Sequence, residues 1–164
     1  MTISSGIPAP EFELLDDTNT LHRLSDFKGY PVILYFYPAD DTSGCTKEAC
    51  GFRDDYSAYQ KAKVTILGIS PDSVKSHIKF KAKYQLPFPL LADENHRVCN
   101  AYGVWGSKKL MGREYEGVLR TTFLIDARGQ IVRVFEDVHP AEHSAEVLEA
   151  LKNLNLMDQL KTQN

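Results

Sequence analysis

Cysteine is scarce in this chain of 164 residues, which has three cysteines and a single tryptophan. Three cysteines cannot form a disulfide-based scaffold, so each thiol needs an explanation of its own. Long apolar runs and blocks of one charge are also missing, and the net charge is −3. These absences argue against a membrane-spanning protein and against an electrostatic binder of nucleic acid or of a membrane surface. The first residues show neither a basic start nor an apolar signal segment, so we expect a cytoplasmic protein.

The hydrophobic pattern predicts an α/β protein. Residues 32–37 and 64–69 are continuously apolar, as is typical of strands buried on both faces. Hairpin patterns occupy residues 12–24 and 121–135, and a short apolar run covers residues 90–92. The predicted helices cover residues 43–61, a segment opened by residues 71–73 that carries Val74, Ile78 and Ala82, residues 96–102, and a C-terminal segment with Val147, Leu148, Leu151 and Leu154.

This order of elements indicates one domain, residues 1–164, with a mixed central sheet flanked by helices. It fits a thioredoxin-like fold with an N-terminal β-hairpin addition. Other α/β arrangements share the same pattern, so the order alone leaves the topology open.

Cys45 lies at the start of the expected helix 43–61. If Thr42 is the N-cap, Cys45 falls in the first turn, where unpaired amides and the helix dipole stabilise a thiolate. Pro38 ends the preceding strand, and Gly44 lets a small ligand approach the backbone. A buried structural cysteine on the apolar face of the helix is the alternative, and helix position alone does not separate the two.

Cys50 follows Cys45 by five residues on the same expected helix. Such a spacing separates the two Cα atoms by roughly 8–9 Å, which is beyond the reach of a disulfide unless the helix end unwinds. A metal site is disfavoured because the two thiols do not share a helix face and no nearby histidine completes a ligand set. The spacing is also too long for the C-x-x-C motif of thiol oxidoreductases.

The pattern Pro38-x3-Thr42-x2-Cys45 resembles the active-site signature of peroxiredoxins, and residues 42–50 resemble its Q-type subgroup, also called bacterioferritin comigratory protein. The resemblance departs at Ser43, where the subgroup often has proline, and at the acidic pair of residues 40–41. We expect that carboxylate pair to disfavour the thiolate slightly. Further similarity covers residues 35–38, 67–70, 103–106 and 120–126.

The resemblance implies a thiol-dependent peroxidase for hydrogen peroxide and organic hydroperoxides, without a metal or an organic cofactor. Cys45 would attack the peroxide and become a sulfenic acid, Thr42 would hydrogen-bond the thiolate and the peroxide, and Arg120 would steady the negative charge. Cys50 matches the resolving cysteine that closes an intramolecular disulfide. Thioredoxin is the expected reductant, with glutathione or glutaredoxin as alternatives, and the subgroup suggests a monomer.

Two other functions remain open at this point. One is a thioredoxin-fold binding or chaperone protein that uses Cys45 and Cys50 as a redox switch, and the other is a thiol–disulfide reductase. Cys99 is expected to be a packed thiol, with a role as alternative resolving partner or in linking monomers as the minor possibility. A Cys–His protease-like enzyme is disfavoured because the histidines form no recognisable nucleophile–base arrangement. These are His22, His77, His96, His139 and His143.

Overall fold

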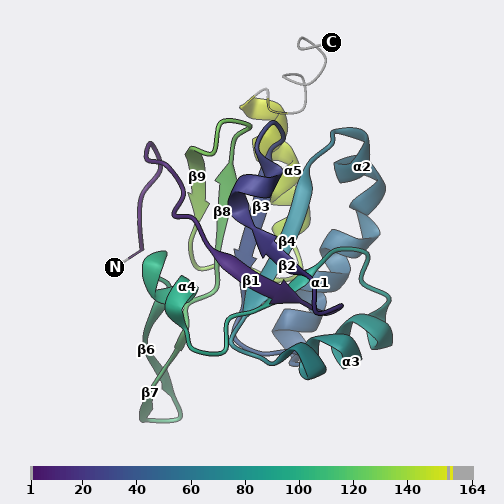
Figure 1. Cartoon of the computed structure of the whole chain (residues 1–164). Coiled ribbons are helices and arrows are strands. Elements are labelled where there is room, and N and C mark those ends of the chain that lie inside the picture. The colour runs from purple at the N-terminus through teal and green to yellow at the C-terminus, as the bar shows by residue number, and fades with distance from the viewer. Residues whose placement is uncertain (1, 155, 157–164) are drawn as a thin grey trace.

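The computed structural model describes residues 2–154 and 156, and its centre is a seven-stranded mixed sheet (Figure 1). The strand order is β2-β1-β5-β4-β3-β8-β9, in which β3, β4 and β5 run parallel and the outer pairings are antiparallel. The strands are β1 (Glu13–Asp16), β2 (Leu21–Arg23), β3 (Val32–Phe36), β4 (Thr65–Ser70), β5 (Leu90–Ala92), β8 (Thr121–Ile125) and β9 (Ile131–Phe135).

Helices cover both faces of this sheet. Alternate residues of β3 point to opposite sides, so Ile33 and Tyr35 join one apolar cluster while Leu34 and Phe36 join the other. The first cluster includes side chains of α1, α2, α3 and α5, and the second includes those of η1 and α4. The helices are η1 (Leu24–Phe27), α1 (Ser43–Asp54), α2 (Tyr56–Lys61), α3 (Val74–Tyr84), α4 (Arg97–Ala101) and α5 (His143–Asn153).

The expected strands, hairpins and C-terminal helix are confirmed, but two helical predictions need correction. Residues 43–61 form two helices, because Asp55 leaves the helical conformation and its carboxylate accepts a hydrogen bond from the Ser144 hydroxyl at 2.7 Å. In α3 the buried side chains are His77 and Phe80, whereas Ile78 is 51% exposed. A hydrogen-bonded histidine therefore occupies the inner face of α3, which the apolar pattern did not reveal.

The sequence pattern missed a third hairpin, formed by β6 (Trp105–Leu110) and β7 (Arg113–Val118). It projects from the body below α4 in Figure 1. Met111 and Gly112 form its two-residue turn with φ angles of 53° and 79°, as a tight hairpin requires. In the part of the chain that the structure describes, no helix is long and apolar enough to cross a membrane.

Candidate active site

Cys45 lies beside the carboxyl end of the central strand β3. The strand ends at Phe36, a loop leads to the N-cap Thr42, and α1 begins at Ser43. Cys45 is therefore the third residue of the helix, as the sequence predicted. Its side chain is packed in the core and only 1% exposed.

Arg120 contacts the Cys45 sulfur from the other side of the site. Its Nη2 donates a hydrogen bond to Sγ at 3.2 Å. The contact joins distant parts of the chain, because Arg120 precedes β8 and the antiparallel register pairs Thr121 with Phe36 at the end of β3. Gly44 makes room for the guanidinium, since a Cβ at this position would lie 3.1 Å from Nη2.

Glu48 is a third member of the site, and sequence reasoning missed it. Its Oε1 accepts a hydrogen bond of 2.8 Å from Arg120 Nη1, so one guanidinium bridges the carboxylate and the thiol. Burial raises the pKa of Glu48 to about 7, although Arg120 opposes that rise. Glu48 follows Cys45 by three residues, and that spacing on one helix face was the available signal.

Thr42 and Pro38 lie in the loop that leads to α1. The Thr42 backbone occupies the N-cap position, but its hydroxyl donates to the Ala39 carbonyl at 3.0 Å and makes no cap hydrogen bond. The hydroxyl therefore closes the preceding loop and does not cap the helix. Pro38 directly follows the last buried residue of the strand region, Tyr37, and is half-buried.

The acidic pair before Thr42 is directed toward α3. Asp40 Oδ2 lies 2.7 Å from His77 Nδ1, and its Oδ1 accepts the Tyr37 hydroxyl proton at 2.6 Å. Asp41 accepts hydrogen bonds from Lys83 and from the Tyr84 hydroxyl, both at 2.8 Å. Both carboxylates therefore have partners on or beside α3, and the expectation that this pair disfavours the Cys45 thiolate stays a prediction.

The other two cysteines differ in their surroundings. Cys50 is half-buried on α1, and all three thiols are free. Cys99 is fully buried on α4, and burial raises the pKa of its thiol. Cys45 and Cys99 belong to apolar clusters on opposite faces of the sheet, which disfavours any pairing between them.

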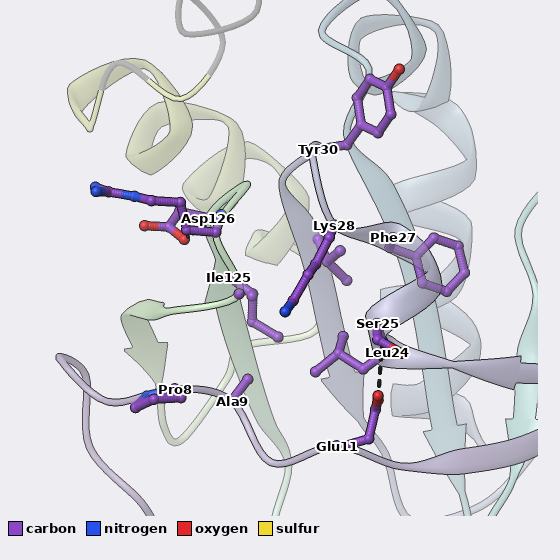
Figure 2. Close-up of a pocket in the computed structure, with 13 residues that line it drawn as sticks. Pro8, Ala9, Glu11, Leu24, Ser25, Phe27, Lys28, Tyr30, Ile125 and Asp126 are labelled. Carbon is purple, nitrogen blue, oxygen red and sulfur yellow. Dashed lines mark hydrogen bonds between the residues drawn. The ribbon is translucent and has the colours of Figure 1, made fainter.

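A cluster of acidic and histidine side chains and a cavity away from Cys45 are two other candidate ligand sites. Asp40, Asp72 and His77 approach one another closely enough to hold a metal ion, but Asp40 is already hydrogen-bonded to both of the others. A cavity of about 170 Å³ lies at the opposite end of β3, where Val32 and Ile125 form part of its wall (Figure 2). None of the described residues that line it is a cysteine.

Comparison with known proteins identifies the family. Residues 5–134 match the model of the AhpC/TSA family. The chain belongs to this family of peroxiredoxins. It is 54% identical over 148 residues to a putative peroxiredoxin of Coxiella burnetii, covering 90% of this chain and 98% of the relative. It is 46% identical over 155 residues to peroxiredoxin Bcp of Bacillus subtilis, covering 94% of this chain and 99% of the relative.

Solved structures agree with this placement. The bacterioferritin comigratory protein of Xanthomonas campestris, described with an alkyl peroxide reduction activity, matches with a TM-score of 0.85 and 36% identity over 91% of this chain and 98% of its own. A peroxiredoxin Q variant of Xylella fastidiosa matches with a TM-score of 0.88 and 32% sequence identity, covering 94% of this chain and 98% of its own. The thioredoxin-like fold is thereby confirmed, and as a peroxiredoxin this chain is a thiol-dependent peroxidase, an oxidoreductase.

Proposed function

We propose that Cys45 is the peroxidatic nucleophile that reduces hydrogen peroxide and organic hydroperoxides. The thiolate attacks the terminal oxygen of the hydroperoxide, the O–O bond breaks, and Cys45 becomes a sulfenic acid. The departing oxygen leaves with the electron pair of that bond and takes a proton from solvent, which gives water or an alcohol. The hydrogen bond of 3.2 Å from Arg120 to the sulfur is the observation that carries this proposal.

Arg120 acts as the fixed cation of the site. Its guanidinium cannot lose its charge at physiological pH, so it favours the thiolate and the negative charge that develops on the departing oxygen. Glu48 holds the other nitrogen of the same group at 2.8 Å and thereby orients it. In this proposal the Thr42 hydroxyl, which donates to the Ala39 carbonyl in the present structure, turns to hydrogen-bond the thiolate and the incoming peroxide, and Pro38 shapes the adjoining loop.

Cys50 resolves the sulfenic acid in this proposal. Its thiolate attacks the Cys45 sulfur, an S–S bond forms, and the sulfenic oxygen leaves as water after protonation. Both residues belong to the continuous helix α1, so the first turns must unwind before the sulfurs can meet. We propose thioredoxin as the dithiol that then reduces the disulfide and becomes oxidised itself.

Peroxide titration of defined variants tests these roles. The reduced protein should lose two thiols rapidly when hydrogen peroxide is added, Cys45→Ser should lose none rapidly, and Cys50→Ser should stop at an overoxidisable sulfenic acid. Cys99→Ser serves as the matched control and should behave like the parent protein. Unchanged peroxide consumption by Cys45→Ser would contradict the proposal, and coupling to thioredoxin against glutaredoxin identifies the reductant.

We also infer that residues 1–164 act as one domain, as a monomer, in the cytoplasm. The three free thiols suit a reducing compartment, and the subgroup resemblance supports the monomer. Light scattering of the reduced and the oxidised protein tests the oligomeric state. A mass above that of one chain in the reduced form would refute the monomer.

A further inference from the structure

One lysine of the exposed β6–β7 hairpin is turned toward the body of the protein. Lys108 is half-buried, and its Nζ donates a hydrogen bond to the Val118 carbonyl at 2.9 Å. Its neighbour Lys109 has a side chain that is 78% exposed and lies 3.8 Å from a Glu114 oxygen. Because successive side chains of a strand point to opposite faces, Lys109 is a matched control for Lys108 that lacks its contact with the body of the protein.

Glycines at the base of the hairpin make this arrangement possible. Gly106 and Gly117 are paired across β6 and β7. A Cβ on Gly117 would lie 3.4 Å from Cδ of Lys108, so the lysine stem passes closely over that backbone. A Cβ on Gly106 would lie 3.1 Å from the Leu119 side chain. The side chains of Lys108 and Leu119 therefore pack against glycine backbone. This packing directs the Lys108 side chain toward the base of the hairpin, where Val118 lies.

The carbonyl that Lys108 holds belongs to the segment that delivers Arg120. Val118 ends β7, and β8 begins at Thr121, so the link between the strands consists of Leu119 and Arg120 alone. The Thr121 hydroxyl donates to the Leu119 carbonyl at 2.8 Å. Side-chain donors thus fix the carbonyls of the two residues that precede Arg120, with the ammonium of Lys108 on Val118 and the Thr121 hydroxyl on Leu119.

Lys108 and Arg120 also face one cavity, which has a volume of about 470 Å³. Burial and the charge of Arg120 lower the pKa of Lys108, while the charge of Cys45 raises it, so the three groups lie within electrostatic range. The carboxylates of Glu136 and Asp137 also line this cavity, and their negative charges offset those of the two cations. The other lining residues are Thr2, Leu119, Thr121, Val138 and His139.

We propose that Lys108 is a positioning residue of the peroxide site, which holds the link carrying Arg120 and adds positive charge to the cavity that Arg120 faces. The inference rests on the proposed role of Cys45. It assigns a task in the reaction to the hairpin, whose strands pair with each other and not with the seven-stranded sheet.

Substitutions at the two neighbouring lysines test this inference. Lys108→Met and Lys108→Gln should lower the second-order rate constant for hydrogen peroxide by roughly three- to ten-fold, as expected for loss of one partly screened cation. The thiolate absorbance of Cys45 should also rise at a higher pH in both variants. Lys108→Arg should retain both properties within about two-fold, because it keeps the charge and the donors. Lys109→Met should match the parent protein.

Three outcomes would overturn the inference. The first is a Lys108→Met protein with the parental rate and thiolate titration. The second is a slower reaction with an unchanged thiolate titration that Lys108→Arg does not restore, since only a structural role predicts it. The third is an equal loss in Lys109→Met. The parent protein and Cys45→Ser are measured in the same experiment, so a failure of the proposed role of Cys45 is seen separately.

Discussion

Glu48 and His143 should give the protein opposite pH dependences of stability that cancel. Both side chains are 1% exposed. Burial raises the pKa of Glu48 from 4.5 to about 7 and lowers the pKa of His143 from 6.5 to about 4. Between about pH 4.5 and pH 7, Glu48 of the folded protein keeps a proton that Glu48 of the unfolded chain has lost. Folded His143 lacks a proton that the unfolded chain binds.

The signs follow from proton linkage. The Glu48 contribution is favourable at low pH and is lost as the pH rises from about 4.5 to about 7, where the buried carboxyl must ionise. The His143 contribution is present above about 6.5 and is lost as the pH falls to about 4, because the unfolded imidazole binds a proton. Each slope is about 1.4 kcal/mol per pH unit, with opposite sign. Between about pH 5 and pH 6.5, each contribution therefore changes by about 2 kcal/mol, and the sum of the two stays nearly constant.

Single neutral substitutions should expose each slope. In Glu48→Gln, the free energy of unfolding should rise by about 2 kcal/mol between about pH 5 and pH 6.5, because the His143 contribution is no longer offset. In His143→Asn it should fall by about 2 kcal/mol over the same range. The loss of ring packing against Phe52 and Phe135 lowers the stability of His143→Asn at every pH without changing that slope.

Urea unfolding followed by circular dichroism at several pH values measures these slopes. The double variant is the control and should again be nearly flat. Asp16, whose pKa is lowered to about 2, titrates below this range and does not interfere. A Glu48→Gln protein whose stability follows the parental curve would refute the reasoning, because it would mean that Glu48 ionises alike in the folded and unfolded states.

Three further substitutions have defined outcomes. Gly44→Ala should slow the reaction with peroxide at least several-fold in stopped-flow measurements, because its Cβ would lie 3.1 Å from Arg120 Nη2 and displace the guanidinium. Gly68→Ala should lower the free energy of unfolding by about 2–3 kcal/mol in urea titrations, because its Cβ would lie 2.8 Å from the buried Tyr35 ring. Cys99→Ala should leave the rate of peroxide consumption unchanged and lower stability by about 1 kcal/mol through lost packing.

The core of the fold was predictable because its signals are local. The run of residues 32–37 is apolar at every position, and it forms a strand buried on both faces. The β6–β7 hairpin was not predictable in the same way. Most of its side chains are exposed, so no apolar alternation marks its strands. Its tight turn also places Met111 at a positive φ, a conformation that residue type does not indicate.

The part of the site that could be predicted from the sequence is the part whose residues lie close together along the chain. Thr42 and Cys45 follow from the helix start, and the family pattern added Arg120. The contact between Arg120 and the thiol depends on the register of β8 against β3, which joins residues 75 positions apart. Glu48 was missed because a charged residue on a helix is usually solvated. Its burial is stabilised by the ion pair with Arg120, which reaches it from the residue before β8.

The contacts of α3 limit how α1 can rearrange during the proposed disulfide formation. The loop before α1 is anchored through Asp41 to Lys83 and Tyr84, and the end of α1 is anchored where Arg53 Nη1 donates to the Tyr84 carbonyl at 2.7 Å. Displacing α1 as a whole would break both sets of contacts. Unwinding only the turns between them leaves both sets in place and still lets Cys50 approach Cys45. The shortest rearrangement is therefore confined to the segment that begins at Ser43 and ends before Phe52, whose side chain is fully buried in the core.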